Sequence, residues 1–384
     1  MILEKELTML NSLSRERLDM LMRSAESVTP GHPDKICDQV ADGLVDEVMR
    51  DGKDARMAAE VTGGHGSLFI TGEGRSHHQM AEFEARATQI ANLVYEEVAG
   101  DTLDQVIYHL VQQCPEISQG VDPGGAGDQG CMIGFATDET PEMLPLPFAY
   151  ARRLTNAMYK AAMDHSIPWM GTDGKSVVVM QGQHVKHVTI AILHNPDVTD
   201  EQIKRDLMQK IIVPQIGELP VDVTLTINGA GRWTIGGFAA DAGTTGRKLI
   251  VDNYGPEVSI GGGAYSGKDP TKVDRSAAYM ARYIAKNIVA HKIGGASRAF
   301  VQLAYTIGVP DPNALVALAY NDVSGSVEDV SAWVRRSFDL RPRAIIEQLN
   351  LIRPIYRQVN VGGHYGHTSD HDVWTWEAIN SSLS

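Results

Sequence analysis

The chain has 384 residues, of which 43% are hydrophobic and 21% are charged, and its formal net charge is −14. This composition is typical of globular domains with enough apolar material for a buried core, and the length suits two or three domains. The acidic balance argues against a sequence-independent nucleic-acid binder, which needs a basic face, but it allows a nucleotide substrate held by local cations or a metal.

The sequence lacks the usual features of a membrane-spanning or secreted protein. No stretch approaches the ~18–20 uncharged apolar residues that a membrane span needs. Charged residues already occupy positions 4–6, so the first residues lack the apolar run of a signal peptide. The cysteines are too few and too scattered for a disulfide framework or a zinc site: they are Cys37, Cys114 and Cys131. We therefore expect a cytoplasmic protein with no membrane partner.

In chain order, the first third of the sequence predicts helices and one pair of strands. Residues 1–23 mix apolar and charged positions and predict an amphipathic helix or an extension. Residues 24–52 predict a loop followed by a helix, because apolar residues recur there at helical spacing. Residues 55–73 predict two strands joined by a glycine-rich turn, and residues 77–99 predict a second helix. Residues 120–130 are rich in glycine and proline and indicate either a linker or a mobile functional loop.

The rest of the chain predicts further helices and paired strands. Helices are expected at residues 147–165, 200–216, 273–291, 327–338 and 341–351. Strands are expected at residues 176–181, 186–194, 221–228, 231–237, 248–254, 298–308 and 313–321. Helix–strand–strand groups recur about three times in this order, which favours an α+β class with helices covering one face of each sheet. The tail at 362–377 is polar and irregular and predicts a mobile, solvated segment rather than a metal site, despite His364, His367 and His371.

Residues 31–35, Gly-His-Pro-Asp-Lys, stand at the beginning of the first strongly predicted helix. Asp34 beside Pro33 can simply cap this helix and complement its dipole. An aspartate, a lysine and backbone N–H groups at a helix N-terminus also make a suitable metal–phosphate site. On these residues alone the two interpretations have equal weight.

Residues 260–274 match most of the P-loop pattern, because Gly262, Gly267 and Lys268 fall at its spacing. Asp269 stands where the Mg²⁺-binding hydroxyl belongs, and the helical periodicity begins only later. The segment is therefore not expected to be a P-loop, although its cations and carboxylates could still bracket a metal-bound polyphosphate. Taken one at a time, the charges at 125–130 and 241–248 are most simply solvated surface groups.

Together these segments resemble the S-adenosylmethionine synthetase (methionine adenosyltransferase) family from about Ser24 to the C-terminal region. The motifs that carry the resemblance occur in the family's order: GHPDK, GAGDQG, GRWTIGG, DAGTTGRKLIVDNYG, GGGAYSGKDPTKVDRSAAYMARYIAKNIVA and FDLRP. The most specific are GAGDQG and the GGGAYSGKDPTKVDRS stretch. An ordinary P-loop phosphotransferase is a further alternative, and it predicts that Asp269→Ser increases activity.

The resemblance implies three similar βαββαβ-type α+β domains with pseudo-threefold symmetry. They would be residues 24–119, 128–235 and 236–384, with an N-terminal extension at 1–23 and a gating loop at 120–127. The resemblance also implies a tight homodimer with active sites shared between subunits, and two such dimers often form a tetramer in this family.

The implied reaction joins ATP and L-methionine to S-adenosylmethionine, and the triphosphate leaves as phosphate plus pyrophosphate, with two Mg²⁺ and one K⁺ assisting. A thioether sulfur that attacks the ribose C5′ has no proton to lose, so no general base is needed. The reaction instead needs alignment of the sulfur with the breaking bond and neutralisation of the departing triphosphate. A site rich in Lys, Arg, His and Asp, without a catalytic triad, meets these needs.

Carried over by position, the resemblance places His32 at the C5′–O5′ bond, Asp34 and Asp274 on Mg²⁺, and Glu60 on K⁺. The residues assigned to the polyphosphate and to catalysis are Lys35, Lys175, Arg247, Lys248 and Lys268. Those that border ATP also include Asp173, Gly174, Arg232, Trp233, Asp241 and Ala264, with Trp233 suited to stacking on adenine. Those around methionine are Glu73, Gln113, Asp241 and Lys272, while Asp128 would lie near the phosphates and metals.

Three features depart from the family pattern. The loop between Gln119 and Gly125 is roughly five residues shorter than in many bacterial relatives, in which it gates the site. Residues 191–193 replace a Ser-x-Gln that often contacts adenosine. The N-terminal extension and the His-rich tail have no clear counterpart. A non-catalytic relative that binds nucleotide therefore remains an alternative.

Overall fold

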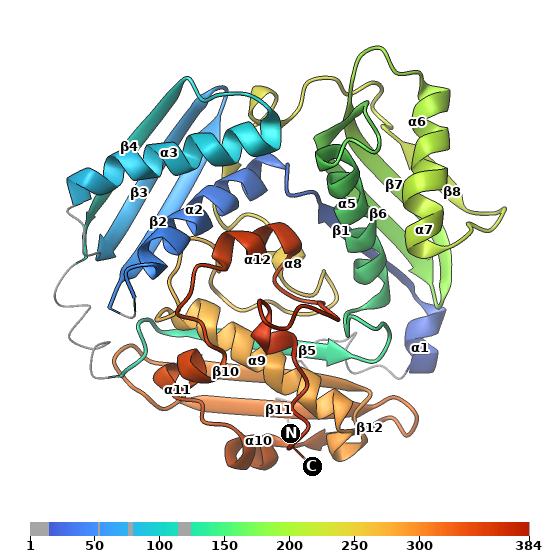
Figure 1. Cartoon of the computed structure of the whole chain (residues 1–384). Coiled ribbons are helices and arrows are strands. Elements are labelled where there is room, and N and C mark those ends of the chain that lie inside the picture. Colours follow the sequence, from blue (N-terminus) through green and yellow to red (C-terminus); the bar gives the residue numbers. More distant parts are fainter. Residues whose placement is uncertain (1–14, 53, 76–79, 114–123, 384) are drawn as a thin grey trace.

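Three four-stranded sheets, each with helices on one face, form the part of the chain that the computed structural model describes, residues 15–52, 54–75, 80–113 and 124–383. The three sheet-and-helix units surround the centre of the molecule in Figure 1, where the C-terminal segment lies between them. This arrangement confirms the expected α+β fold with three domains.

The units follow one order of elements: helix, strand, strand, helix, strand, with changes in the third. The first unit contains α2 (Pro33–Met49), β2 (Arg56–Gly64), β3 (Ser67–Arg75), α3 (Met80–Ala99) and β4 (Gln105–Gln112). The second contains α5 (Leu146–Met163), β6 (Met170–Gln181), β7 (His184–His194), α6 (Asp200–Asp206), a π-helical turn (Leu207–Ile212), α7 (Val213–Ile216) and β8 (Thr224–Ile227). The third contains α9 (Val273–Ala290), β10 (Arg298–Tyr305), β11 (Ala314–Asn321), β12 (Ser326–Asp329), α10 (Ser331–Ser337), α11 (Pro342–Gln348) and α12 (Tyr356–Gly362).

A leading strand precedes each unit in the sequence but joins the sheet of another unit. β1 (Met22–Val28) pairs antiparallel with β6, β5 (Gly130–Thr137) with β10, and β9 (Gly243–Thr244) with β2. The strand orders are therefore β4-β3-β2-β9, β1-β6-β7-β8 and β12-β11-β10-β5. Because the exchange runs from the first unit to the second, the second to the third and the third to the first, the three units are locked to one another.

Helix α9 shows how closely the layers pack. Every residue from Val273 to Val289 is buried, because the helix lies between β5 and β10 on one side and α11 and the tail on the other. The backbones of β5 and α9 touch at Gly134, where a Cβ atom would lie 2.1 Å from the backbone of Ala281. A glycine is required at such an approach.

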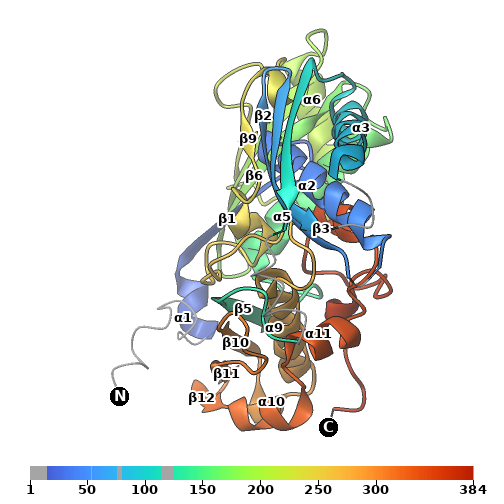
Figure 2. The ribbon, with the colours of Figure 1, turned by 90° about the vertical axis from the view of Figure 1, so that its left-hand side faces the viewer.

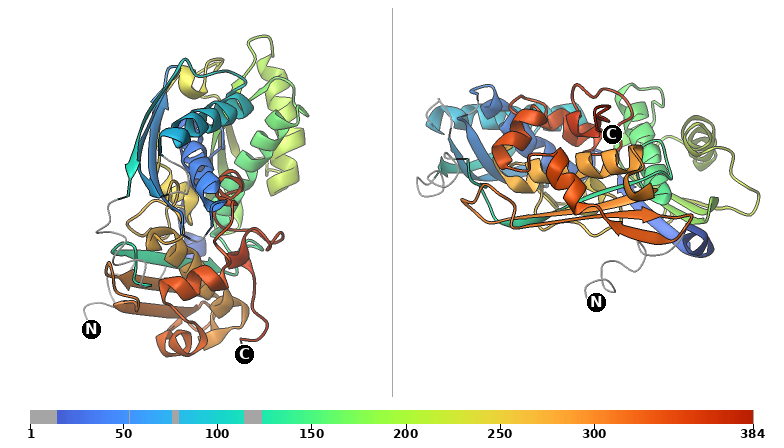
Figure 3. Two further views of the ribbon diagram at one scale, coloured as in Figure 1. Left: turned by 60° about the vertical axis from the view of Figure 1, so that its left-hand side comes forward. Right: turned by 90° about the horizontal axis from the view of Figure 1, so that it is seen from below.

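The uncovered faces of the first two sheets point to the same side of the molecule. In Figure 2 the strands β1, β2, β6 and β9 lie toward the left, and helices α2 and α3 lie toward the right. In the right-hand view of Figure 3 the C-terminal end lies on the helix-covered side, above the strands of the third unit. Within the described ranges, no helix is long and apolar enough to span a bilayer.

Most predicted elements are confirmed, and the differences concern short segments. The expected helix at 1–23 corresponds in part to α1 (Arg15–Met20), while residues 1–14 lie outside the described residues. The sequence did not predict β1, β4 or β5. Two predicted strands are wrong, because residues 231–237 form an irregular loop and residues 248–254 contain the short helix α8 (Leu249–Asp252). Short apolar runs fit a strand or a helix equally well, so tertiary contacts decide between them.

Both ends of the C-terminal tail are docked and partly buried, so the prediction of a mobile, solvated segment is wrong there, while residues 368–372 between them are exposed. His364 and Trp376 are both 0% exposed. Glu377 is also buried and accepts hydrogen bonds of 2.8 Å from Arg282 Nε and 2.9 Å from Lys286 Nζ on α9. The polar sequence of the tail does not indicate that it packs against the protein. Glu377 can be buried because Arg282 and Lys286 of the distant helix α9 neutralise its carboxylate.

Candidate active site

His32 occupies the N-cap of α2, after a tight turn that begins at Thr29. Gly31 is required in this turn because a Cβ atom there would lie 2.4 Å from the carbonyl oxygen of Thr172. The Nδ1 atom of His32 accepts a 3.1 Å hydrogen bond from the backbone N–H of Asp34, as N-cap side chains do. Since Nδ1 is an acceptor, the proton of the neutral imidazole lies on Nε2, which can donate.

The environment of His32 keeps its imidazole neutral. Burial, and then the positive charges of Lys248 and Lys175, lower the pKa of His32 to about 4, while Asp34 and Asp241 act in the opposite direction. At neutral pH the ring is therefore an uncharged hydrogen-bond donor among cations. Such a donor is suited to an oxygen that gains negative charge during a reaction.

Asp34 joins the first turn of α2 to the loop that follows β9. Its Oδ2 lies 2.5 Å from Lys248 Nζ, its Oδ1 accepts a 2.9 Å hydrogen bond from Thr244 N, and Arg247 Nε lies 3.8 Å away. Burial raises the pKa of this carboxyl, but the hydrogen bonds from Lys248 and Thr244 outweigh burial and hold the pKa below its usual value. The carboxylate is therefore ionised and carries its own counter-ion.

β6 brings the second segment of the site beside His32. Thr29 forms two hydrogen bonds with Gly174. Thr29 N donates to Gly174 O at 2.9 Å, and Gly174 N donates to the Thr29 hydroxyl at 2.8 Å. Asp173 is buried and accepts a 2.9 Å hydrogen bond from Gly237 N, and burial raises its pKa to about 6 although this bond lowers it. Lys175 follows and is exposed. We name the assembled group the His32 cluster: His32, Asp34, Lys175, Asp241, Arg247 and Lys248.

Lys35, although assigned to the polyphosphate, does not lie among these exposed cations. Its Nζ lies 2.7 Å from Asp252 Oδ1 and 3.0 Å from Asp38 Oδ2, in the interior. Burial lowers the pKa of Lys35, but the two carboxylates outweigh burial and raise it above its usual value. The side chain is thus a buried, charged link between α2 and α8.

The GAGDQG motif and the GGGAYSGKDPTKVDRS stretch lie side by side at Asp274. Lys268 Nζ lies 2.6 Å from Asp274 Oδ2. A Cβ atom on Gly263 would lie 2.1 Å from the carboxylate of Asp274, and one on Gly130 would lie 3.3 Å from it, so both glycines make room for this side chain. Burial raises the pKa of Glu60, which Lys268 opposes. We name Glu60, Lys268 and Asp274 the Lys268 cluster.

The residues assigned to methionine form two separate pairs. Gln113 Nε2 donates a 3.2 Å hydrogen bond to Glu73 Oε1, between the ends of β4 and β3. Lys272 Nζ donates a 2.5 Å hydrogen bond to Asp269 Oδ2. Asp269 is fully buried and also accepts from Met57 N at 2.8 Å. The aspartate that interrupts the P-loop pattern therefore joins the third unit to the first.

The adenine-side residues are fixed by the loop before α6. The guanidinium of Arg232 lies 3.1 Å from Asp200 Oδ1 and also donates to backbone carbonyls. Trp233 N donates a 3.2 Å hydrogen bond to His194 Nε2, and the indole N–H donates to Ile235 O at 2.7 Å. Trp233 is therefore held by its backbone N–H and by its indole N–H.

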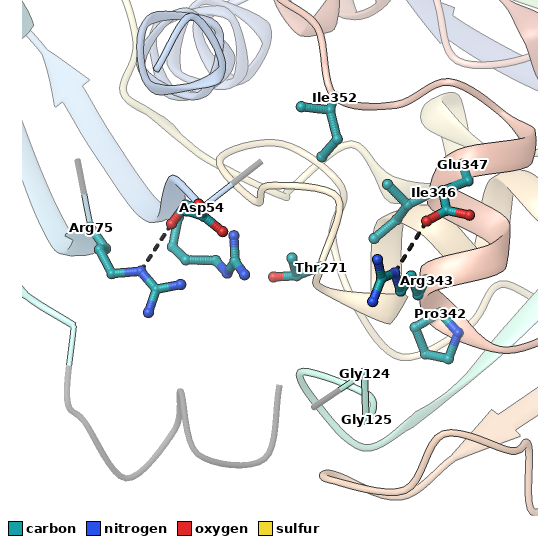
Figure 4. Close-up of a pocket in the computed structure, with 11 residues that line it drawn as sticks. Asp54, Arg75, Gly124, Gly125, Thr271, Pro342, Arg343, Ile346, Glu347 and Ile352 are labelled. Atoms are coloured by element: carbon teal, nitrogen blue, oxygen red, sulfur yellow. Dashed lines mark hydrogen bonds and ion pairs between the residues drawn. The ribbon is translucent and has the colours of Figure 1, made fainter. Parts of the chain in front are cut away.

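A pocket of about 650 Å³ lies elsewhere, between β3, α11 and the segment that leads into β5 (Figure 4). Figure 4 shows that Arg75 bonds to Asp54 and that Arg343 bonds to Glu347 at its rim. None of the assigned site residues, all of which lie in the described ranges, is among the residues that line it. We place the candidate site at the charged clusters, because size alone does not supply phosphate-binding chemistry.

β2 separates the two clusters although it anchors both. Its edge binds the loop of one cluster through Thr245 N to Val61 O at 2.8 Å, and the loop of the other through Ala59 N to Gly267 O at 2.9 Å. Ala59 and Val61 are buried against α2, whereas Glu60 between them is exposed on the opposite face. The side chain of Glu60 therefore points away from the N-terminus of α2, where Asp34 lies.

The glycine-rich segment before β5 is described only from residue 124. Ala126 pairs with the 307–309 segment, with a 3.1 Å hydrogen bond from Ala126 N to Val309 O. Asp128 accepts a 2.7 Å hydrogen bond from Gln129 N, two residues before the glycine that contacts Asp274. The first half of the expected gating loop at 120–127 lies outside the described residues.

Sequence reasoning missed the buried partners of the site. Asp38 and Asp252 hold Lys35, and His194 holds the Trp233 backbone. Asp38 lies one turn beyond Asp34 on α2, which is a signal that helical spacing could have supplied. Asp252 and His194 carry no such local signal, because their partners are distant in sequence.

Comparisons with known proteins identify the family. Models of the S-adenosylmethionine synthetase N-terminal, central and C-terminal domains match residues 20–115, 123–233 and 235–378. The C-terminal match includes the His-rich tail, so the expectation that the tail lacks a family counterpart is wrong. The S-adenosylmethionine synthase of a Nitratiruptor species is 39% identical over 373 residues, which cover 92% of this chain and 94% of that protein. The chain belongs to the S-adenosylmethionine synthetase family, the methionine adenosyltransferases.

Proposed function

We propose that this chain transfers the adenosyl group of ATP to the sulfur of L-methionine by direct in-line attack at C5′, and then hydrolyses the triphosphate to phosphate and pyrophosphate. The observation that carries the proposal is His32, a neutral imidazole with its Nε2 proton available, held among Lys175, Arg247 and Lys248. This group matches a leaving oxygen that gains charge at the end of a polyphosphate.

The charge on the leaving group determines what the His32 cluster must do. His32 donates from Nε2 to the departing O5′, while the cations neutralise the triphosphate beyond it. Arg247 and Lys248 are neighbours in one loop, so they can bind adjacent phosphates. Methionine sulfur needs no deprotonation, which agrees with a site that offers donors rather than a base.

The carboxylates of Asp34 and Asp274 fit the two Mg²⁺ ions implied by the family. Each lies against one lysine ammonium and so already occupies a cation-binding environment. Within the described ranges no group of three or more His, Cys, Asp or Glu side chains could hold a metal by itself. That agrees with Mg²⁺, which binds one or two carboxylates and takes its other ligands from water and phosphate. When bound, Mg²⁺ would neutralise charge on the triphosphate.

The remaining assignments follow from position. Glu60, an exposed carboxylate beside Lys268, is the proposed K⁺ ligand. Trp233 would stack on adenine. The other proposed ATP contacts are Asp173, Gly174, Arg232, Asp241, Ala264 and Lys268. The proposed methionine contacts are Glu73, Gln113, Asp241 and Lys272.

The separation of the two clusters supports a shared site. Because Glu60 faces away from α2, we propose that the Lys268 cluster of one subunit completes the His32 cluster of another across the uncovered sheet faces. We further propose domains at 24–119, 128–235 and 236–384, a gating loop at 120–127 and a cytoplasmic homodimer. Pairing of these dimers into a tetramer is consistent with the same proposal.

The test incubates the purified full chain with ATP, methionine, Mg²⁺ and K⁺. The expected products are the sulfonium S-adenosylmethionine, one phosphate and one pyrophosphate for each ATP. Production of ADP would overturn the proposal. Nucleotide binding without turnover would instead favour the non-catalytic alternative.

A further inference from the structure

The imidazole of His364 is fully buried, yet one of its nitrogens lacks a hydrogen-bond partner. Its ring lies edge-on to Tyr265, with centroids 4.9 Å apart, and is stacked near Tyr279. The Nδ1 atom lies 2.9 Å from the hydroxyl of Tyr279. The Nε2 atom has no hydrogen-bond partner among the described residues, and it lies 3.8 Å from Asp252 Oδ1. A buried polar atom without a partner is costly and calls for an explanation.

The protonation state of His364 follows from its surroundings. Burial, and then the charges of Lys35, Arg275 and Arg152, lower its pKa well below the usual value, so the ring is neutral. We assign the Tyr279 hydroxyl as the donor to Nδ1, which leaves the single ring proton on Nε2. That nitrogen lies 3.8 Å from Asp252 Oδ1, and a movement of about 0.8 Å would bring the pair within hydrogen-bonding distance.

Asp252 connects this imidazole to the proposed polyphosphate site. Its Oδ1 accepts from Lys35 Nζ, and its backbone N donates a 2.9 Å hydrogen bond to the carbonyl of Lys248. On the other side of Lys35, Asp38 accepts a 2.9 Å hydrogen bond from Gly246 N. Both ends of the segment that carries Arg247 and Lys248 are thus attached to one buried group of charges.

We propose that His364 is a positioning residue that acts through Asp252: its Nε2–H orients the carboxylate toward Lys35 and so fixes the loop that presents Arg247 and Lys248 to the triphosphate. The tail reaches this point because Trp376 stacks on Tyr279 at 3.8 Å and donates from its indole to the carbonyl of His364 at 2.7 Å. This role rests on the proposed function, since it assumes that Arg247 and Lys248 bind the triphosphate of ATP.

The test compares His364→Leu, which removes the donor at similar volume, with His364→Gln, which keeps an N–H donor on a side chain of similar reach. In the full chain, His364→Leu should raise the KM for ATP and the inhibition constant of inorganic triphosphate about tenfold, with kcat within about twofold. His364→Gln should restore both constants to within about threefold of the wild type. If His364 had only a structural role, the two variants should change these constants to the same extent whenever they lower the melting temperature to the same extent.

His367→Leu is the matched control. His367 is a half-buried imidazole of the tail, stacked on Trp374 at 3.8 Å and hydrogen-bonded to Gly363 O at 2.8 Å. Its substitution should disturb tail packing without changing the inhibition constant of triphosphate. An equal change in His367→Leu would overturn the positioning role of His364.

Tyr279→Phe keeps the inference testable if His364→Leu does not fold. It removes only the hydroxyl that fixes the tautomer, and it should raise the same two constants in the same direction. Unchanged constants in Tyr279→Phe and in a folded His364 variant would refute the inference. A wild type that forms no sulfonium product would instead refute the proposed function. In that case the affinity of the His364 variants for inorganic triphosphate, measured by calorimetry, would still test the inference.

Discussion

At the residue scale, one backbone hydrogen bond decides what His32 can do. The bond from Asp34 N occupies Nδ1 and directs the Nε2 proton outward. Lysine or arginine in its place would supply charge, but a buried neutral imidazole supplies a directed donor among groups that already carry the positive charge.

Replacement of His32 by asparagine should therefore separate the two chemical steps. Asparagine keeps the N-cap, so α2 should begin normally. Loss of the donor should slow sulfonium formation by about 100-fold or more. Hydrolysis of added inorganic triphosphate should fall far less, because it breaks no C5′–O5′ bond. Rapid-quench measurement of both steps checks this, and equal losses would contradict the role of His32.

At the element scale, the loop from residue 260 to 272 contains one glycine that its packing requires and another that it does not. Gly267 has φ +80°, and a Cβ atom on it would lie 1.9 Å from Ala59 O. Gly262 has open space around its Cβ position. Of these two glycines only Gly267 is required by packing against β2, and Lys268, which follows it, lies beside Asp274.

Gly267→Ala should lower the free energy of unfolding by about 1–3 kcal/mol, because it adds backbone strain at a close contact. The activity should also fall, since Lys268 follows directly. Gly262→Ala is the control and should change stability by less than about 0.5 kcal/mol. Urea unfolding of both variants measures the difference, and similar values for the two would show that the contact with Ala59 is unimportant.

The tail is a second element whose contribution has a pH dependence. Burial raises the pKa of Glu377, but Arg282 and Lys286 outweigh it and lower the pKa from 4.5 to about 2. The folded-state pKa lies below the unfolded one, so the stabilisation is complete above pH 4.5 and is lost as the pH falls toward 2.

Glu377→Gln should cost about 3–5 kcal/mol at neutral pH, because it leaves buried cations unpaired. The difference from the wild type should narrow as the pH falls through 4.5 toward 2. Denaturant unfolding at several pH values tests this. Glu347→Gln, at an exposed ion pair with Arg343, should change stability by less than about 0.5 kcal/mol at any pH. A pH-independent cost of Glu377→Gln would argue against the ionised pair.

At the scale of the whole molecule, the exchange of leading strands links the three units. The His32 cluster and the Lys268 cluster lie on opposite faces of β2. A shared site predicts complementation between subunits. His32→Asn and Lys268→Ala should each be nearly inactive alone. Random mixing after unfolding and refolding should restore roughly a quarter of wild-type activity, because half the dimers are mixed and each contains one intact site.

The control mixes His32→Asn with Lys248→Ala, which lie in the same cluster. This pair should restore nothing, since no combination of subunits has an intact His32 cluster. Restoration in the control, or none in the test mixture, would show that the clusters do not meet across subunits. Sedimentation of the wild type gives the oligomeric mass independently.

Local patterns predicted the long elements well. α2, α5 and α9 have helical periodicity over several turns, and the β2–β3 and β10–β11 pairs alternate with clear turns. The failures have a common cause. β9 is two residues long, β5 follows a glycine-rich stretch, and α8 is a single turn, so each is defined by the partner it contacts rather than by its own residues.

The site divides in the same way. Its chemistry could be assigned from His32, Asp34, Lys248, Lys268 and Asp274, because their motifs are short and specific. Their partners could not be assigned. Lys35 resembled an exposed cation in the sequence, and His364 resembled part of a solvated segment, but distant residues bury both side chains.

The sequence by itself determined the α+β class, the family and the residue types that meet a polyphosphate, because these depend on local periodicity and on contiguous motifs. Only the tertiary structure decided which sheet each leading strand joins, which face Glu60 points to, and that His364 lies 3.8 Å from Asp252. The reason is physical: burial, many of the charge pairs and the tautomer of a buried imidazole depend on groups that are distant in the sequence, as Tyr279 is brought to His364 across 85 residues.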